Sequence, residues 1–151
     1  MRRFVFLTLS ALMFVGTLQA QEPDRQRVMN LLAGYEWRLI PERWQQLGGD
    51  ADLILMEVVT DPQLMNVYRF RAMEVLTLYP TNRVADFLER FTLSATEVPL
   101  LWRSFRSMER SFKTSQPDRV ARLATQLLQH PNARVREDAA RTLGELGRQA
   151  F

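Results

Sequence analysis

The sequence predicts an all-α protein, and three observations support this fold class. Beyond residue 23, apolar residues recur with a period of about 3.6 residues, and no segment alternates convincingly with a period of two. Proline and glycine fall mainly between the apolar stripes, where one helix ends and another begins. The 151-residue chain contains no cysteine, so neither disulfides nor thiolate metal sites can support it. The helices must therefore be held together by an apolar core.

The first twenty residues have the three zones of a secretory signal peptide. Arg2 and Arg3 form a positive n-region, residues 4–15 are mostly apolar, and Ala20 places a small residue at the cleavage position. The apolar run is shorter than the roughly 20 residues that span a bilayer. We therefore expect a bacterial, Sec-type signal peptide over residues 1–20 that is cleaved near Ala20, which makes the protein periplasmic or secreted. An uncleaved membrane anchor and a buried N-terminal helix are the alternatives.

The charge of the chain does not favour nucleic acid as a partner. The formal net charge of +3 falls to +1 when Arg2 and Arg3 leave with the signal peptide. Nucleic-acid binding depends on many cationic contacts to phosphates, and its strength scales with their number. We therefore expect a protein partner rather than a nucleic acid.

Capping residues mark the ends of several predicted helices. Asp50 precedes one apolar stripe as a predicted N-cap residue, and the pair Thr81-Asn82 precedes another as capping residues. The Thr96 hydroxyl precedes another stripe, and Pro99 fits the first turn of that helix. Gly147 follows the last stripe as a predicted C-cap.

The stripes group into units of helix, short turn and helix. Their starts near Asp50, Asn82 and Pro117 are separated by the roughly 30–45 residues of a helix-pair repeat. Residues 21–47 do not complete such a unit, because Gly34 and Pro41 interrupt them, and they form a predicted N-terminal helical cap. The repeat region then covers residues 48–149, and its predicted units are residues 50–80, 82–113 and 117–147.

The last unit, PDRVARLATQLLQHPNARVREDAARTLGELG, resembles the HEAT-like repeat family. The matching positions, which lie in its turn and its second helix, are Pro131, Val135, Arg136, Ala139, Ala140, Leu143, Gly144 and Leu146. The unit at 50–80 keeps Asp61 and Arg69, whereas the unit at 82–113 keeps only the apolar stripe. The resemblance implies a short right-handed α-superhelix, or α-solenoid, of about three helical hairpins. It also implies structural roles for a set of repeat positions, namely Asp61, Arg69, Pro131, Val135, Arg136, Ala139 and Leu143.

The sequence contains no recognisable catalytic or metal-binding constellation. His130 is the only histidine, and there is neither a nucleophile elbow nor a phosphate-binding glycine loop. Neighbouring carboxylates such as Glu137 and Asp138 lie near helix starts, where they balance the helix dipole. We therefore expect no enzyme activity, no metal and no cofactor.

Two sets of residues are candidates for protein binding. The resemblance implies that the second helix of each unit lines a concave side used for binding, and the candidate arginines there are Arg71, Arg103, Arg106, Arg110 and Arg141. Such guanidinium groups suit an acidic protein segment, although pairing with acids on the same helix is the alternative. Trp37 and Trp44 are candidate aromatic contacts, and the alternative is that they form the core of the cap.

The function expected from these observations is that of a non-enzymatic, exported scaffold or adaptor. Its partner is another exported or membrane protein, and no membrane span remains after signal cleavage. No further helix is predicted that would cover the open face of the last helix. A face with Leu143, Leu146 and Phe151 is therefore a candidate for self-association. The alternative function is a small-ligand carrier or lyase-like enzyme with an aromatic-lined groove near Trp37, Trp44 and Trp102.

Overall fold

The computed structural model describes residues 24–149, and this part of the chain contains eight α-helices and no strand, which confirms the all-α class. The helices are α1 (Arg25–Leu32), α2 (Pro41–Gln45), α3 (Ala51–Thr60), α4 (Asn66–Leu76), α5 (Asn82–Ser94), α6 (Val98–Phe112), α7 (Pro117–Leu127) and α8 (Ala133–Gln149). The predicted signal peptide and Phe151 lie outside the described residues. Within residues 24–149, no helix combines the length and the apolar character needed to cross a membrane.

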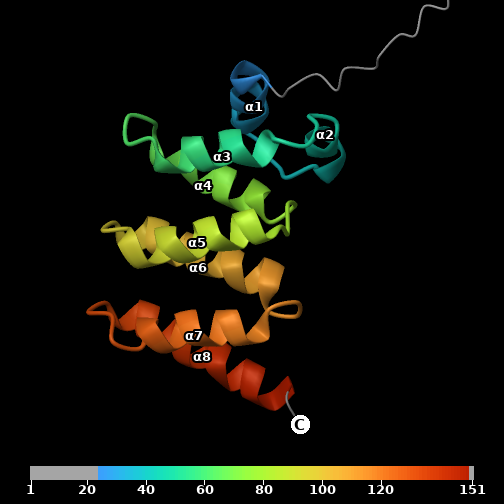
Figure 1. Ribbon diagram of the computed structural model, residues 1–151. Helices are drawn as coiled ribbons and strands as arrows, with labels where there is room; N and C mark the ends of the chain where they lie inside the picture. The colour runs from blue at the N-terminus through green and yellow to red at the C-terminus, as the bar shows by residue number, and fades with distance from the viewer. Residues whose placement is uncertain (1–23, 150–151) are drawn as a thin grey trace, which may run out of the picture.

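The six longer helices pack in pairs that follow the chain order. The most extensive contacts join α3 to α4, α5 to α6, and α7 to α8. Figure 1 shows these pairs stacked one upon the next, with α3, α5 and α7 toward the viewer and α4, α6 and α8 behind them. Between the pairs, α6 packs on α4 and also contacts α7 and α8. Helices α4, α6 and α8 therefore lie side by side along one side of the molecule.

Local sequence explains most of the helix ends. The Thr81 side chain accepts a hydrogen bond from the backbone N–H of Val84 at 3.3 Å, as expected of an N-cap residue. Asp50 occupies the N-cap position of α3 but makes no capping bond, and its carboxylate lies 3.3 Å from Arg83. At the start of α6 the N-cap residue is Glu97 rather than Thr96.

The predicted C-cap at Gly147 is wrong, because α8 continues to Gln149. A glycine inside a helix costs only about 1 kcal/mol relative to alanine. The packing of Leu143 and Leu146 against the core in the preceding turns offsets this cost. These two leucines are half-buried rather than exposed, so the candidate face for self-association is partly covered within the chain.

Helix α6 supplies much of the core. Phe105, Met108 and Phe112 are fully buried along it. Ser104 and Ser107 are also buried on this helix and donate hydrogen bonds to backbone carbonyls of α5 and α4 at 3.0 Å each. Their small side chains allow close helix approach, and both of these hydroxyl groups are paired, whereas the buried Ser111 hydroxyl on the same helix has no partner among residues 24–149.

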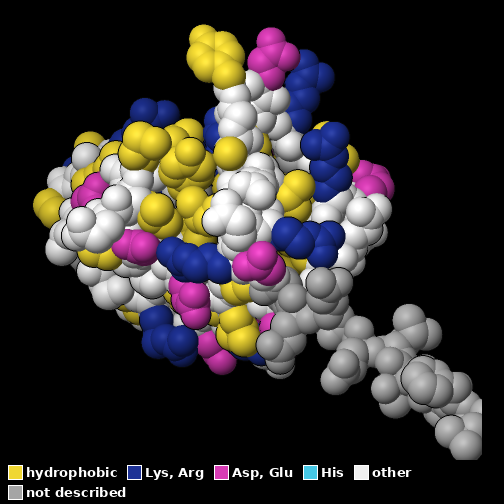
Figure 2. Space-filling view, turned by 90° about the horizontal axis from the view of Figure 1, so that it is seen from above, with side chains coloured by type: hydrophobic (Ala, Val, Ile, Leu, Met, Phe, Trp, Pro, Cys, Tyr) yellow, Lys and Arg dark blue, Asp and Glu magenta, His cyan; other side chains and the backbone are white. Residues whose placement is uncertain are grey.

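The N-terminal end is formed by α1, α2 and the loop between them. Helix α1 packs against α3 and α4, and Arg71 of α4 donates a hydrogen bond to the Leu32 carbonyl at 2.6 Å. Trp44 of α2 lies in the core, whereas Tyr35 in the loop is fully exposed. Figure 2 looks down on this end and shows hydrophobic side chains gathered in one region, with charged side chains spread over the rest. This end therefore carries some exposed apolar surface.

Candidate functional site

A hollowed surface runs over α4, α6 and α8, and it consists of two adjoining hollows. Both are lined by Phe70, Trp102 and Arg103. The smaller hollow, of about 180 Å³, is completed by Met73, Glu74, Arg106, Ser107 and Arg110. The larger hollow, of about 340 Å³, is completed by Val98, Pro99, Arg134 and Val135, and we refer to it as the apolar hollow. The lining of the apolar hollow contains two arginines and no carboxylate.

Three arginines of this surface stack on aromatic rings, and we refer to these three pairs as the arginine–aromatic row. The guanidinium carbon of Arg71 lies 5.3 Å from the centre of the Trp37 ring. Arg103 lies 4.2 Å from the ring centre of Phe70, and Arg134 lies 5.4 Å from that of Trp102. In each pair the two residues come from neighbouring elements, and the arginine belongs to the element that is later in the chain. The row thus connects the N-terminal loop to α4, α4 to α6, and α6 to α8, and each such contact stabilises by about 0.5–1 kcal/mol at an exposed site.

The row follows a spacing that is visible in the sequence. Trp37, Phe70 and Trp102 stand at intervals of 33 and 32 residues, and each is followed directly by an arginine. The arginine after Phe70 stacks on Trp37, and the arginine after Trp102 stacks on Phe70. Five aromatic–arginine dipeptides occur in the sequence, and only those that begin at Trp37, Phe70 and Trp102 share an interval of 32–33 residues. It ends at Arg134, because the preceding residue is Ala133 rather than an aromatic.

The predicted binding arginines, and Arg134 beside them, which was not among the predicted residues, differ in how many of their N–H groups bind within the protein. Among the described residues, the guanidinium groups of Arg103 and Arg134 form neither a hydrogen bond nor an ion pair. Arg110 lies 4.0 Å from Glu74, and its side chain is 66% exposed. Arg71 uses one N–H group on the Leu32 carbonyl. Arg103 and Arg134 therefore keep the most donor capacity for a partner.

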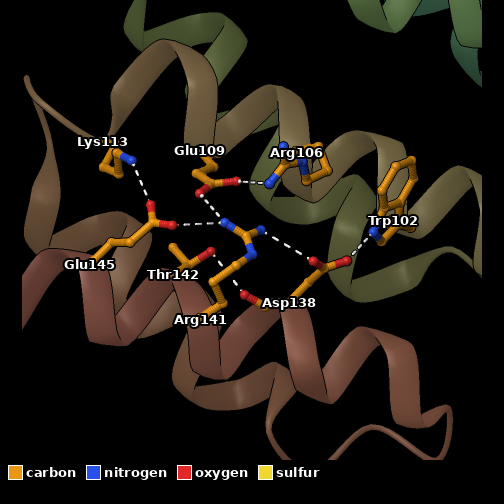
Figure 3. Close-up of polar contacts among 8 residues, drawn as sticks. All are labelled: Trp102, Arg106, Glu109, Lys113, Asp138, Arg141, Thr142 and Glu145. Carbon is orange, nitrogen blue, oxygen red and sulfur yellow. Dashed lines mark hydrogen bonds and ion pairs between the residues drawn. The ribbon is translucent and has the colours of Figure 1, made fainter.

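Arg141 is bound by three carboxylates in an ion-pair network between α6 and α8, which Figure 3 shows. Its guanidinium lies 3.4 Å from Glu109, 3.1 Å from Asp138 and 3.0 Å from Glu145. Glu109 is only 5% exposed and also accepts a hydrogen bond from Arg106 at 2.8 Å. Because its charge is matched inside the protein, Arg141 serves the contact between the helices.

Two further donors complete the α6–α8 ion-pair network. Lys113 donates to Glu145 at 2.8 Å, and the indole N–H of Trp102 donates to Asp138. Burial alone would raise the pKa of Asp138, but the hydrogen bonds from Trp102 and Arg141 outweigh it, so this pKa lies below its ordinary value. Hydrogen bonds from Lys113 and Arg141 lower the pKa of Glu145. Both carboxylates therefore remain ionised at neutral pH and hold the two helices together.

The two candidate tryptophans differ in their surroundings. Trp44 is 2% exposed and belongs to the hydrophobic core, so it matches the core alternative rather than the predicted contact residue. Trp37 is half-buried, donates to the Leu31 carbonyl at 2.9 Å and carries the Arg71 guanidinium on its ring. Trp37 and Trp44 line one hollow whereas Trp102 lines others, so the three tryptophans do not share a groove.

The residues expected to have structural roles lie in turns and helix contacts. Arg69 is 7% exposed and donates to the Val59 carbonyl at 2.9 Å, and it also pairs with Glu97. Arg136 donates to the carbonyls of His130 and Pro131 at 2.9 and 2.8 Å. Each arginine therefore bonds to carbonyl groups near the turn of its own helix pair.

The other expected structural positions contribute apolar packing or turn bonds. Val135 and Ala139 of α8 are buried, and Leu143 is half-buried against the core. Asp61 follows α3 and accepts a hydrogen bond from the backbone N–H of Gln63 at 2.9 Å. In the same way, the only histidine, His130, accepts the backbone N–H of Asn132 at 3.0 Å within its turn. In residues 24–149, no group of three or more acidic or histidine side chains is arranged to hold a metal ion.

No family model matches the chain, and neither a curated protein nor a solved structure matches it. The likeness to HEAT repeats therefore rests on the residues and spacings of this chain alone.

Proposed function

We propose that this protein is a non-enzymatic interaction scaffold, exported to the periplasm, that binds another exported or membrane protein through the surface of α4, α6 and α8. In this proposal the three helix pairs are HEAT-like repeats that form a short right-handed solenoid, and α1 and α2 cap its first unit. The surface of α4, α6 and α8 is then its concave side.

Two regular features support the repeat architecture. The first is the arginine–aromatic row, in which Trp37, Phe70 and Trp102 recur at intervals of 33 and 32 residues. The second lies on α3, α5 and α7, where an arginine of each later helix binds a carboxylate of the helix before it. Arg83 lies 2.7 Å from Asp52, and Arg119 lies 2.6 Å from both Asp86 and Glu89. Contacts that recur between neighbouring units are what a stack of repeats requires.

One observation carries the binding proposal: Arg103 and Arg134 line the same apolar hollow, and within residues 24–149 neither guanidinium has a partner. Most other arginines of α4, α6 and α8 are matched by carboxylates or carbonyls of the chain itself. A hollow with an apolar lining and free guanidinium groups is suited to bind a protein segment that carries carboxylates.

Co-purification tests the proposal. The full chain with a C-terminal tag is expressed in a Gram-negative host, and proteins retained from the periplasmic extract are identified. The variant R103E/R134E is compared with R90E/R122E, which makes the same change in net charge at exposed arginines of α5 and α7. We expect one or more specific proteins to be retained by the parent and by R90E/R122E but lost from R103E/R134E. Equal retention by all three proteins would contradict binding through this surface.

The same experiment addresses export. Mass spectrometry of the protein recovered from the periplasm should show a mature N-terminus near Gln21, as cleavage near Ala20 requires. Recovery only from the cytoplasm or with an intact N-terminus would contradict the proposed processing.

A further inference from the structure

We infer that the apolar hollow is also a binding site for a small monocarboxylic acid, in which a single carboxylate is attached to an apolar group. This inference goes beyond the proposed function, because such an acid can fill the hollow whether or not a protein binds the surface of α4, α6 and α8. Three observations carry it: the residues that line the hollow, the hydrogen bond that holds Trp102, and the sign of the charges around the hollow.

Most of the lining of the apolar hollow is apolar. Besides the two arginines, it consists of Phe70, Val98, Pro99, Trp102 and Val135. Small-ligand sites have volumes of roughly 300–1,000 Å³ and are mainly apolar, with a few polar groups that orient the ligand. The hollow, at about 340 Å³, lies at the lower end of this range. A compact apolar group therefore matches both its size and its lining.

The Trp102 side chain is held in place without a ligand. Its indole N–H donates to Asp138 of α8, so the one polar group of this side chain already has a partner. The guanidinium of Arg134 lies 5.4 Å from the centre of the same ring. Trp102 therefore offers a ligand only apolar contact, and little side-chain freedom is lost there on binding.

The charges around the hollow favour an anion. Within residues 24–149, Arg103 and Arg134 are the charged side chains that line it, and no carboxylate does. Val98 and Pro99 belong to the first turn of α6, and Arg134 and Val135 belong to the first turn of α8. The partial positive charge of these two helix starts adds to the charge of the guanidinium groups. A carboxylate is the anion that pairs best with a planar guanidinium on an organic ligand.

Two acids beside the lining are already paired with other arginines. Glu97, which precedes α6, lies 3.2 Å from Arg69, and Asp138 lies 3.1 Å from Arg141. They therefore compete little for the arginines of the hollow. A ligand with a single carboxylate leaves its remaining atoms to contact the five apolar side chains, whereas a second carboxylate would lose hydration against them.

Titration with acids of increasing chain length tests the apolar contact. Acetate, butanoate and hexanoate are added at constant ionic strength to the protein purified after expression of the full chain. Tryptophan fluorescence reports binding, because Trp102 lines the hollow. Each added methylene group should tighten binding by about twofold to fourfold, as its removal from water implies. Equal affinity for the three acids would indicate that the arginines bind any small anion, and it would overturn the inference.

Ligands of matched chain length test the carboxylate. Hexanoate is compared with hexanamide, which has no charge, and with adipate, which carries a carboxylate at each end. We expect hexanoate to bind about tenfold more tightly than hexanamide, as a hydrogen bond to a charged group implies. Hexanoate should also bind more tightly than adipate. Hexanamide or adipate binding as tightly as hexanoate would overturn the inference.

Variants test the position of the site. R103Q/R134Q should weaken hexanoate binding about tenfold, whereas R90Q/R122Q makes the same change in net charge at exposed arginines and should leave it unchanged. Val98→Glu places a carboxylate in the lining, at a helix start where an acid is favourable, and should also weaken binding. Far-UV circular dichroism checks that each variant remains folded. Unchanged affinity in R103Q/R134Q or in Val98→Glu would place the ligand elsewhere and overturn the inference.

The results distinguish this inference from the proposed function. If hexanoate does not bind while R103E/R134E loses the co-purified partner, the small-acid site is refuted and the proposed function stands. If hexanoate binds with the expected preferences while R103E/R134E retains every co-purified protein, the small-acid site stands and protein binding through this surface is refuted.

Discussion

Glu109 offers the most direct test of how the last helix pair is attached to the rest of the stack. Its carboxylate is 5% exposed and lies 2.8 Å from Arg106 and 3.4 Å from Arg141, so it connects α6 to α8. The substitution Glu109→Gln keeps the size of the side chain but removes the charge. The two arginines then face an amide that cannot neutralise them.

The expected loss of unfolding free energy follows from how deeply each charged side chain is buried. Breaking a fully buried ion pair costs about 3–5 kcal/mol, because an uncompensated charge remains in the interior. Here the side chains of Arg106 and Arg141 are 41% and 38% exposed, so water compensates part of the loss. We therefore expect Glu109→Gln to lower the free energy of unfolding by about 2–3 kcal/mol.

Urea unfolding monitored by far-UV circular dichroism measures this change. With a dependence of unfolding free energy on urea of about 1–3 kcal/mol per molar, the midpoint should fall by about 0.7–3 M. Glu145→Gln is the matched control, because Glu145 also pairs with Arg141 but its side chain is 28% exposed. That control should cost only about 0–1 kcal/mol.

Hydrogen exchange shows where the stability is lost. In a stack whose units contact only their neighbours, weakening the α6–α8 contact should increase exchange in α7 and α8 before it affects α3 and α4. A Glu109→Gln variant within about 0.5 kcal/mol of the parent, or equal to Glu145→Gln, would refute the reasoning from burial. Increased exchange confined to α3 and α4 would refute the assignment of Glu109 to the last contact.

Three further predictions concern the core, the α3–α5 contact and the α6–α8 contact. Phe105→Ala should lower the free energy of unfolding, measured in urea, by about 3–5 kcal/mol, because the Phe105 ring is fully buried. A loss below about 1 kcal/mol would show that neighbouring side chains move to fill the cavity. Asp52→Asn should lower the free energy of unfolding by about 2–4 kcal/mol, because this acid is 1% exposed and receives two hydrogen bonds from Arg83. Asp50→Asn, which removes the exposed partner of the same arginine, should lower it by less than about 0.5 kcal/mol. Equal losses would contradict the role of burial. The lowered pKa of Asp138 means that its ion pairs contribute stability above the ordinary carboxyl pKa of 3.8 and lose it as the pH falls through the lower value in the folded protein. The difference in stability between the parent and Asp138→Asn should therefore be largest near neutral pH and vanish in acid, and a pH-independent difference measured by urea unfolding would contradict this sign.

The sequence predicted the helices well, but it could not rank the candidate binding residues. Helix boundaries depend on nearby residues, so a cap such as Thr81 could be identified locally. The exception, Gly147, lies where packing of the preceding turns outweighs a weak local preference. The candidate arginines could not be ranked in this way, because their partners are distant in the sequence. Arg141, for example, is bound by Glu109, 32 residues earlier.

The sequence by itself determined the all-helical class and the positions of most turns, because periodicity and capping act over a few neighbouring residues. Only the tertiary structure decided which guanidinium groups are free. Arg106 and Arg141 meet the buried Glu109 when α8 packs on α6, whereas Arg103 and Arg134 meet aromatic rings. The physical reason is that a carboxylate neutralises the charge of a guanidinium and accepts its N–H groups, whereas an aromatic ring carries no formal charge to neutralise it.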